Sequence, residues 1–308
     1  MLRTLLLKAS QSRWLAHQAT QRRFAQRAVR RFMPGEDVTA ALDAAQNLAA
    51  QGMPTVLTYL GENVEDAAEA HAVGVHYLDV LDRIAARSLP CHLSVKPTQL
   101  GLDLGEAICA LQLDRLATHA RAAGTMVWVD MEGSPYTDVT VRLYRSLRER
   151  HDNVGLCLQA YLHRSERDLA SLLPMSPSIR LVKGAYREPP SVAFARKRDV
   201  DASFLALARR ILGPAGLRDG AIQGIATHDP TIIDAVRRHA ANTGVPADAY
   251  EFQMLYGIRR EAQRRLVEAG QRVRVLISYG EAWFPWYMRR LAERPANLLF
   301  VMRSLVNR

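Results

Sequence analysis

The stretch MVWVDME, residues 126–132, is a short apolar run that ends in two carboxylates, Asp130 and Glu132. Its β-branched and aromatic residues are typical of a strand, and a strand buried on both faces is expected to be apolar throughout. Burying an unpaired charge is costly, so the two carboxylates need an explanation. For a single strand, a satisfied polar group in the core would be explanation enough. The pattern gains weight only if it is repeated along the chain.

The pattern is repeated eight times after Pro34-Gly35. Longer amphipathic runs, among them 63–87 and 229–244, separate the repeats, and we expect the second half of 63–87 to form an extra helix or a loop. Strands that alternate with helices predict a parallel sheet, and eight such units close into a (β/α)8 barrel. We therefore predict an α/β protein with a basic helical arm, residues 1–34, and a single barrel domain, residues 35–308. The predicted strands are 55–61, 92–98, 126–132, 154–160, 179–184, 222–228, 250–257 and 273–280.

Composition sets limits on the class of protein. The chain has 308 residues, 48% of them hydrophobic, which is enough for a large core. No apolar run reaches about 18 residues, so no transmembrane helix is predicted. The three cysteines, Cys91, Cys109 and Cys157, are too few and too scattered for a disulfide framework, and we expect buried thiols in a reducing compartment. The histidines and cysteines show no metal-binding spacing, so no metal is predicted.

The net charge of +10 is concentrated in the amino-terminal arm, because residues 1–35 contain eight basic residues and no acid. A nucleic-acid-binding protein needs its basic face on the folded body, so no nucleic-acid partner is predicted. The arm is open to three interpretations: packed or surface-lying helices, which we favour, a targeting peptide, or a membrane-surface helix. We predict a cytoplasmic protein, with a peripheral contact to the inner face of the cytoplasmic membrane as an option.

Polar residues occupy or follow the carboxyl end of every predicted strand. In a (β/α)8 barrel these ends form one rim, which is where the active site lies. Eight polar strand ends in register therefore predict a site rather than eight separate satisfied core groups. The residues are Glu62, Lys96, Asp130 with Glu132, Gln159, Lys183, His228, Gln253 with Tyr256, and Tyr279.

The segment FPWYMRRLAERPAN, residues 284–297, follows the eighth strand and carries Arg289, Arg290 and Glu293. Pairs of this kind on a surface helix contribute only about 0.2–0.5 kcal/mol each. A charge-assisted hydrogen bond to a ligand is worth about 1.5–3 kcal/mol. Because the rim already carries Lys96 and Lys183, we predict that the two arginines clamp a carboxylate or phosphate and that Glu293 holds one of them.

The sequence lacks a GxSxG nucleophile elbow, a GxGxxG after the first strand and a P-loop. No cysteine lies at a strand end beside a histidine, so hydrolysis through a covalent nucleophile is disfavoured. The residues alone leave two enzyme classes open. One is a Schiff-base lyase, of the aldolase type, that uses Lys96 or Lys183. The other is chemistry performed by a bound cofactor that the protein orients.

Seven motifs together resemble the proline dehydrogenases in their short, monofunctional bacterial form. They are SVKPTQLGLD, VWVDMEGSP, LCLQAYL, IRLVKGAYRE, IATHD, YEFQMLYGI and YGEAWFPWYMRRLAERPANLLFVMRSL, in order from about residue 34 to the carboxyl terminus. The resemblance implies a distorted barrel that binds FAD without a Rossmann unit. It also implies oxidation of L-proline to Δ1-pyrroline-5-carboxylate by hydride transfer to flavin N5, with a membrane quinone as the electron acceptor.

The resemblance also assigns roles on the substrate side. It implies that Arg289, Arg290 and Lys96 bind the substrate carboxylate, that the catalytic Asp130 orders Lys96, and that Glu293 braces the arginine pair. Glu62 matches a residue thought to form a gate with the first arginine. The residues matched to the wall of the ring pocket are Trp286, Leu181 and Tyr186, although Trp286 and Leu181 could equally be ordinary packing.

On the flavin side, the resemblance places the catalytic Arg180 near flavin N5 and Gln159 beside the ring system. His228 could instead cap the helix that follows Asp229-Pro230, and Met131 could be plain core. The other residues matched to flavin binding are Lys183, Gly184, Ala185, Met131, Thr227 and His228.

One position departs from the family pattern. Many members have a tyrosine four residues before the glycine that ends the eighth strand, and that tyrosine packs over the proline ring and helps to exclude 4-hydroxyproline. Here LISYG places Leu276 at this position. We expect Leu276 to change discrimination between ring substituents while leaving carboxylate binding intact. A dehydrogenase of the same family that prefers 4-hydroxyproline is therefore the alternative within this interpretation.

Overall fold

The computed structural model describes residues 29–293 and the side chains of residues 29–288. Eight parallel strands form a closed barrel in sequence order, with β8 paired to β1. Each predicted strand overlaps one observed strand, although β2 and β5 each begin one residue earlier than predicted, so the predicted (β/α)8 barrel is confirmed. The strands are β1 (Thr55–Tyr59), β2 (Cys91–Val95), β3 (Val127–Val129), β4 (Val154–Gln159), β5 (Ser178–Val182), β6 (Gln223–Ala226), β7 (Tyr250–Leu255) and β8 (Val273–Tyr279).

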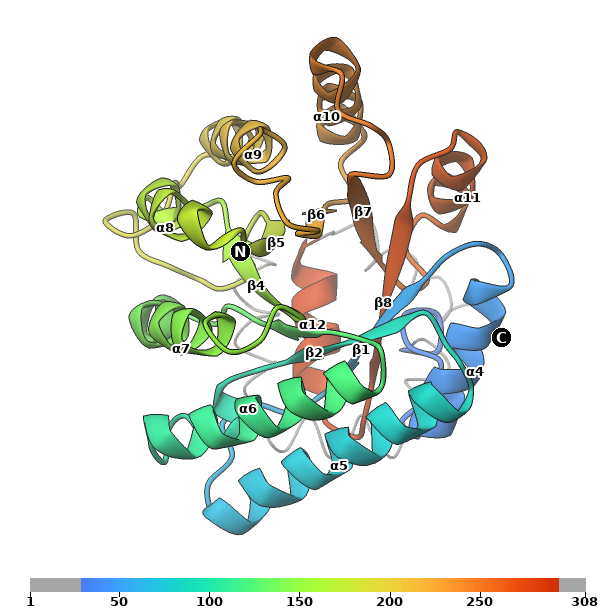
Figure 1. Cartoon of the computed structure of the whole chain (residues 1–308), viewed down its shortest axis with the longest axis vertical. Helices are drawn as coiled ribbons and strands as arrows, with labels where there is room; N and C mark the ends of the chain where they lie inside the picture. The colour runs from blue at the N-terminus through green and yellow to red at the C-terminus, as the bar shows by residue number, and fades with distance from the viewer. Residues whose placement is uncertain (1–28, 294–308) are drawn as a thin grey trace.

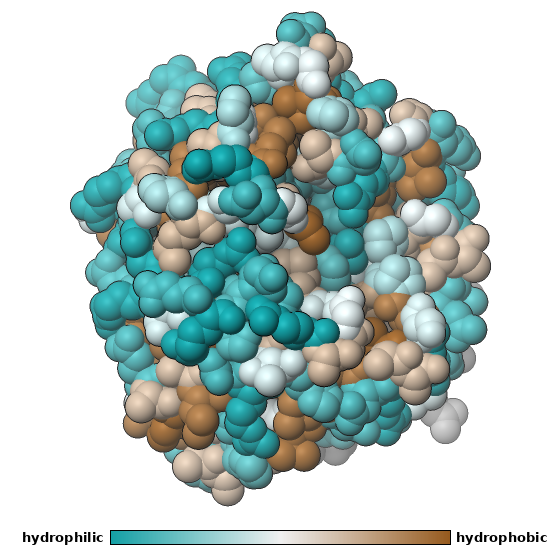
Figure 2. All heavy atoms as spheres, viewed as in Figure 1, coloured by the Kyte–Doolittle hydropathy of each residue, from teal (hydrophilic) through white to brown (hydrophobic). Residues whose placement is uncertain are grey.

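Helices surround this ring of strands (Figure 1). The α-helices are α4 (Val38–Ala49), α5 (Ala67–Ala86), α6 (Glu106–Ala122), α7 (Thr137–Arg148), α8 (Ser165–Leu172), α9 (Lys197–Ile211), α10 (Pro230–Thr243), α11 (Arg260–Glu268) and α12 (Trp283–Glu293). Short 3-10 helices are η1 (Thr98–Leu100), η2 (Ser134–Tyr136) and η3 (Leu173–Met175). The face of the molecule shown in Figure 2 is mostly hydrophilic, with apolar side chains in scattered patches.

Helix α5 corrects the expectation of a break within 63–87. It is one continuous helix of 20 residues, and it begins where the Asp66 carboxylate accepts a hydrogen bond of 2.8 Å from the backbone N–H of Glu69. Its buried residues Val73, Tyr77, Leu81 and Ile84 recur at helical spacing along its whole length, so the second half packs on the barrel as the first half does. The predicted helix 229–244 is confirmed as α10.

The barrel is distorted at its closure. A helix after β8 would ordinarily cover the outside of β8 and β1, but here α4 contacts both of these strands and takes that place in the outer ring (Figure 1). Helix α12 instead projects onto the middle of the ring of strands in the same view. Its buried Trp283, Trp286 and Tyr287 pack in one cluster with Leu60, which follows β1. Since both β8 and β1 end here, α12 lies across the carboxyl ends of the strands.

The main hydrophobic core joins the strands to the surrounding helices, while a small cluster of Val56, Met126 and Trp128 packs separately. Trp128 and its neighbours alternate with residues of the main core along their strands, which places this cluster inside the barrel. All three cysteines are buried free thiols, as predicted. Among residues 29–293, no helix combines the length and apolar character needed to cross a bilayer.

Candidate active site

Strands β2, β3 and β5 bring four polar side chains together near their carboxyl ends: Ser94, Lys96, Asp130 and Arg180. Lys96 directly follows β2 and Asp130 directly follows β3, and the backbone N–H of Asp130 donates to the Val95 carbonyl at 2.9 Å. Arg180 lies within β5 and is only 3% exposed. Parallel pairing of neighbouring strands therefore sets side chains that are far apart in sequence at one edge of the barrel.

Asp130 is the centre of this cluster. Its Oδ2 accepts a hydrogen bond from Lys96 Nζ at 3.3 Å, and its Oδ1 accepts one from Ser94 Oγ at 3.0 Å. Arg180 Nη2 donates to Asp130 Oδ1 and also to Ser94 Oγ, the latter at 2.5 Å. The structure thus brings the predicted residues Lys96, Asp130 and Arg180 into direct contact, with two cations on one carboxylate.

The charges of the cluster decide the protonation state of Asp130. Burial alone would raise the pKa of this carboxyl group, but the charges of Arg180 and then Lys96 outweigh burial and hold its pKa below the ordinary value of 3.8. Asp130 is therefore a carboxylate at neutral pH. Such a group orders the cations beside it and is poorly suited to accepting a proton.

Gln159, at the end of β4, holds a second set of contacts on the rim. Its Nε2 donates to the carbonyls of Met131 at 2.7 Å and Glu132 at 2.9 Å, which fixes the orientation of the amide. Its Oε1 is buried and has no hydrogen-bond partner among the described residues. Met131 contributes its carbonyl here, while its side chain packs in the main core.

Glu132 connects this set to the loop after β2. Its carboxylate accepts hydrogen bonds from the backbone N–H of Thr98 at 2.9 Å and from Thr98 Oγ1 at 2.6 Å. Burial raises the pKa of Glu132 to about 7, although both bonds from Thr98 act in the opposite direction. Glu62, after β1, is close enough for its charge to contribute to this rise.

The segment after β5 carries four of the predicted residues. Lys183 Nζ lies 2.5 Å from Asp201 Oδ1 and 2.9 Å from Asp229 Oδ2, so its charge is paired on both sides. Gly184 has a φ of +122°, and a Cβ there would lie 2.2 Å from the ring of Tyr161. Glycine is therefore required by backbone conformation and by close approach. Ala185 is exposed and Tyr186 is partly buried.

Two predicted residues follow β6. Thr227 Oγ1 accepts a hydrogen bond from the backbone N–H of Asp229 at 3.1 Å, close to the start of α10. His228 Nε2 accepts one from the backbone N–H of Leu255 at 3.1 Å, so the neutral imidazole carries its proton on Nδ1. The cap of α10 is Asp229, which accepts from Thr231, and not His228.

The remaining predicted residues are less tightly connected to the cluster. Leu181 is fully buried in the main core, on the face of β5 opposite to Arg180, and its place in a substrate pocket stays a prediction. Trp286, on α12, packs in the same cluster as Leu60. Leu276 is partly buried inside the barrel, against Val56 and Trp128. The side chains of Arg289, Arg290 and Glu293 lie outside those described, but α12 carries all three across the carboxyl ends of the strands.

Sequence reasoning missed Ser94 and Trp128. Ser94 forms hydrogen bonds with both Asp130 and Arg180. Trp128 lies under Arg180, and the Arg180 Cζ is 5.2 Å from the centroid of the Trp128 ring. Each stands two residues before a predicted site residue, Lys96 or Asp130. Period-two spacing along a strand was therefore a usable signal.

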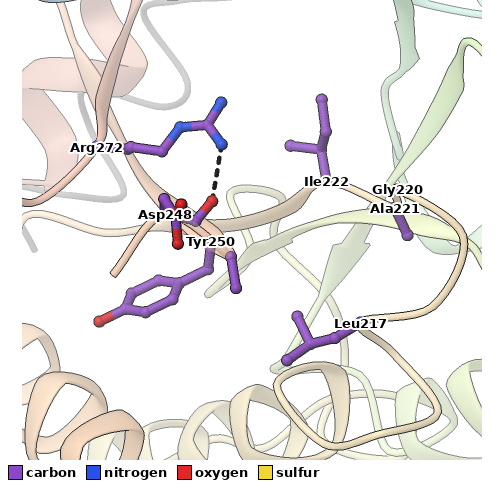
Figure 3. A pocket seen from close by; sticks show the side chains of 8 residues that line it. Leu217, Gly220, Ala221, Ile222, Asp248, Tyr250 and Arg272 are labelled. Atoms are coloured by element: carbon purple, nitrogen blue, oxygen red, sulfur yellow. Dashed lines mark hydrogen bonds between the residues drawn. The ribbon is translucent and has the colours of Figure 1, made fainter. Parts of the chain in front are cut away.

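A pocket of about 240 Å³ lies at the opposite end of the barrel (Figure 3). Ile222 precedes β6, Tyr250 begins β7 and Arg272 precedes β8, so the lining belongs to the amino ends of the strands. Arg272 Nη1 donates to the Asp248 carbonyl at 2.8 Å. None of the predicted site residues lines this pocket, and in barrels of this type the amino-terminal end contributes stability rather than chemistry.

Comparison with known proteins agrees with this geometry. The family described as proline dehydrogenase matches residues 41–303. The chain belongs to the proline dehydrogenase family. It is 36% identical over 279 residues to proline dehydrogenase 1 of Bacillus subtilis strain 168, covering 91% of each chain. It is 37% identical over 281 residues to the proline dehydrogenase of Deinococcus radiodurans, covering 90% of this chain and 89% of that one. The predicted membership of the short bacterial form is confirmed.

Solved structures support the fold. A crystal structure of proline utilization A from Bdellovibrio bacteriovorus, inactivated by N-propargylglycine, superposes with a TM-score of 0.80 at 23% identity. The match covers 87% of this chain and 32% of that longer chain. As a family member, the protein is a proline dehydrogenase enzyme built on a (β/α)8 barrel, and its family implies a flavin cofactor.

The residues at the rim fit a flavin ring system. Such a ring presents carbonyl oxygens and an N–H group along one edge, so it requires both donors and acceptors from the protein. The buried Gln159 Oε1 is an acceptor and the buried Arg180 Nη1 is a donor, and neither has a partner among the described residues. Buried polar groups are ordinarily paired, so a ligand that supplies the missing partners is the simplest explanation for both.

Proposed function

We propose that this enzyme oxidises L-proline to Δ1-pyrroline-5-carboxylate, using FAD, and passes the electrons to a membrane quinone. The observation that carries the proposal is the cluster of Lys96, Asp130 and Arg180 at the carboxyl ends of the strands, beneath a helix that bears Arg289 and Arg290. Within the proline dehydrogenase family, an excess of cations at this rim fits an amino-acid carboxylate. The preference for FAD and a quinone rests on the motifs described above.

Lys96 and the two arginines form the proposed carboxylate site. The ammonium group of Lys96 has three donors, of which one points to Asp130, so two remain for a substrate oxygen. Arg289 and Arg290, from α12, supply planar guanidinium groups that suit bidentate contact with a carboxylate. In this proposal Glu293 braces the arginines and Glu62 closes the site together with Arg289.

Six residues at the carboxyl ends of the strands are proposed to hold the cofactor: Arg180, Gln159, Lys183, Gly184, Thr227 and His228. When bound, a flavin supplies the acceptor for the hydride that leaves the ring carbon next to the proline nitrogen. Arg180 Nη1 and Gln159 Oε1, which are buried and have no hydrogen-bond partner within the described part of the chain, offer one donor and one acceptor to the ring edge. Because Gly184 has no side chain, the ring of Tyr161 packs directly against its backbone, and the Tyr161 N–H donates to the neighbouring Lys183 carbonyl at 2.8 Å.

The protein contributes position more than bond chemistry. Holding the carboxylate at a fixed place aligns the reactive C–H bond, and such alignment can lower a barrier by several kcal/mol. The substrate amine must lose its proton as the C–H bond breaks, since an ammonium nitrogen has no lone pair to form the imine. Asp130 is unsuited to take that proton because Arg180 and Lys96 hold its pKa low. Its proposed role is to order the two cations.

The Schiff-base alternative fits the site less well. A nucleophilic lysine must be neutral, yet the ammonium group of Lys96 contacts one carboxylate and that of Lys183 contacts two. These contacts suit lysines that act as positively charged binding groups. The basic arm that suggests a peripheral membrane contact lies mostly outside the described residues, so this part of the proposal rests on the charge of residues 1–28.

The visible spectrum of the purified protein under anaerobic conditions tests the proposal. We expect flavin absorption that is lost on addition of L-proline and retained on addition of D-proline. Release of the cofactor followed by chromatography and mass determination distinguishes FAD from FMN. A colourless protein that cannot be reconstituted with a flavin, or one that borohydride links covalently to a carbonyl substrate, would contradict it.

A further inference from the structure

Arg180 rests on the ring of Trp128 inside the barrel. The guanidinium Cζ is 5.2 Å from the ring centroid, Trp128 is fully buried and Arg180 is almost fully buried. A cation over an indole face is attracted by the ring quadrupole, and the attraction is larger when both groups are removed from water. The position of the guanidinium group therefore depends on the position of this ring.

Two further residues fix the ring. Trp128 Nε1 donates a hydrogen bond of 3.1 Å to His92 Nδ1. Burial, reinforced by the charges of Arg274, Arg180 and Arg272, lowers the pKa of His92 far below its ordinary value, so the imidazole is neutral and can accept at Nδ1. On β4, a Cβ at Gly155 would lie only 2.4 Å from Trp128 Cε3, so the backbone of β4 packs directly against the six-membered part of the indole.

The contacts continue from the ring to the proposed substrate site. Arg180 contacts Asp130, and Asp130 accepts from Lys96. Five residues thus form an unbroken series of contacts from His92, near the amino end of β2, through Trp128, Arg180 and Asp130 to Lys96 at the carboxyl end of β2. Burying aromatic and cationic groups in this order is unnecessary for barrel closure, because most barrels of this type fill the interior with branched apolar residues.

We propose that Trp128 and His92 are positioning residues for substrate binding, which act by setting Arg180 and, through Asp130, the ammonium group of Lys96. The inference rests on the proposed function, because that function assigns Lys96 to the substrate carboxylate. A purely structural role for the two residues would affect folding stability and leave substrate affinity unchanged. The two roles therefore differ in a measurable way.

The test compares Trp128→Phe and Trp128→Leu in the flavin-loaded enzyme. Phenylalanine keeps an aromatic face under Arg180 but loses the N–H donor, while leucine loses both. We expect KM for L-proline to rise about threefold in Trp128→Phe and about tenfold or more in Trp128→Leu, in line with the range for buried cation–π contacts. The dissociation constant of tetrahydrofuran-2-carboxylate, a ring acid without an amine, should rise in the same order. The shift in unfolding temperature that this acid produces measures the same loss without turnover.

Two further comparisons separate positioning from structure. Phe204→Leu alters an equally buried aromatic residue on α9, in the core between strands and helices, and should lower the unfolding temperature while KM stays unchanged. His92→Gln keeps an acceptor for Trp128 and should preserve KM more nearly than His92→Leu does.

A KM and an acid dissociation constant within twofold of the parent in both Trp128 variants would overturn the inference. If Trp128→Leu does not fold, Trp128→Phe and the His92 pair decide the question by the same criterion. Failure of the parent enzyme itself to oxidise proline would contradict the proposed function, and this result is visible before any variant is compared.

Discussion

Lys96 and Asp130 form an ion pair of 3.3 Å between the residues that directly follow β2 and β3. The pair is only slightly exposed, and the second oxygen of Asp130 is taken up by Ser94 and Arg180. Asp130 is thus the one carboxylate among the described residues that links a strand-end lysine to the buried arginine of β5. The predictions below depend on this arrangement.

Asp130→Asn should raise KM for L-proline at least tenfold, because the neutral amide can no longer hold two cations in place. The protein should still fold and retain its flavin, since asparagine has nearly the same shape. Steady-state kinetics together with the flavin-to-protein absorbance ratio check this. Asp114→Asn is a matched control, because Asp114 on α6 also contacts two partners, Arg150 and His151, and neither is a predicted site residue. A KM for Asp130→Asn equal to that of the control would refute the prediction.

The stability of the parent enzyme in acid should depend on Asp130. Its pKa is lowered in the folded protein, so its carboxylate contributes stability above the ordinary value of 3.8, and that contribution is lost as the pH falls through the lower folded value. The difference in stability between the parent and Asp130→Asn should therefore shrink below about pH 4. Urea unfolding at a series of pH values measures it. A difference that stays constant, or grows, in acid would show that the carboxylate is not held charged.

Glu132 should make folding stability depend on pH in the opposite direction to Asp130. Burial raises its pKa to about 7, from an ordinary value of 4.5, so the folded state binds a proton that the unfolded state has released. Stability should then fall as the pH rises from 4.5 to about 7, by an amount on the order of 3 kcal/mol. Glu132→Gln should remove this slope. If the unfolding free energies of the parent and of Glu132→Gln depend on pH in the same way, the raised pKa of Glu132 would be excluded as the cause.

Gly184→Ala should disturb flavin binding as well as stability. Gly184 combines a φ of +122° with a Cβ position 2.2 Å from the Tyr161 ring, so alanine strains the backbone and collides with the ring. Gly124→Ala is the matched control, because Gly124 has a φ of +66° and nothing within 4 Å of its Cβ position. The control should cost about 1 kcal/mol, and Gly184→Ala about 1–3 kcal/mol more. Flavin affinity should fall only in Gly184→Ala, and an equal effect of the two changes would argue against the close contact.

Leu276 should influence which ring substituents the enzyme accepts. It is partly buried beside Val56 and Trp128, inside the barrel. Leu276→Tyr adds an aromatic ring and a hydroxyl at this position, and we expect the ratio of kcat/KM for proline over trans-4-hydroxyproline to change by about tenfold or more. The KM for proline should change less, since Leu276 packs against Trp128 and not against Lys96 or Asp130. An unchanged ratio would end this hypothesis.

The alternation of strands and helices was readable from the sequence because each strand is a short β-rich run and each ends in a polar residue. The same reasoning located Lys96 and Asp130 at one rim, since parallel strands share their carboxyl ends. It missed the contribution of Trp128, which only the two-residue spacing from Asp130 indicates. Both faces of these strands are buried, so an apolar pattern does not tell the interior of the barrel from the helix-facing side, and Trp128 has the same composition signal as Val127 and Val129.

The position of α4 in the outer ring was also beyond the sequence pattern, although the arginines of α12 were expected at the rim. Helix α4 takes the place of α12 in the outer ring because Trp283 and Trp286 of α12 pack with Leu60. Leu60 is more than 200 residues away from both tryptophans in the sequence. The expected break in 63–87 failed for a different reason. Gly74 in the middle of α5 lets this helix approach Gln112 of α6, where a Cβ would lie 2.3 Å from the amide oxygen. Close packing of the two helices outweighs the low helix propensity of glycine.

Arg290→Met should raise KM for L-proline more than tenfold while the protein keeps its yellow colour. Methionine retains the apolar stem of arginine and removes the charge, so packing of α12 is affected little. Loss of the flavin in this variant would show that the arginine is structural. The flavin content measured from the visible spectrum serves as the internal control.

Recognition of the carboxylate is the central claim, and the rate of flavin reduction under anaerobic conditions tests it most directly. Stopped-flow measurements should compare L-proline with L-prolinamide, which has the same ring and amine but no carboxylate. We predict that the apparent dissociation constant for prolinamide is at least tenfold higher in the parent enzyme, and that Arg290→Met and Asp130→Asn narrow this difference. Equal affinity for the acid and the amide in the parent enzyme would contradict the account.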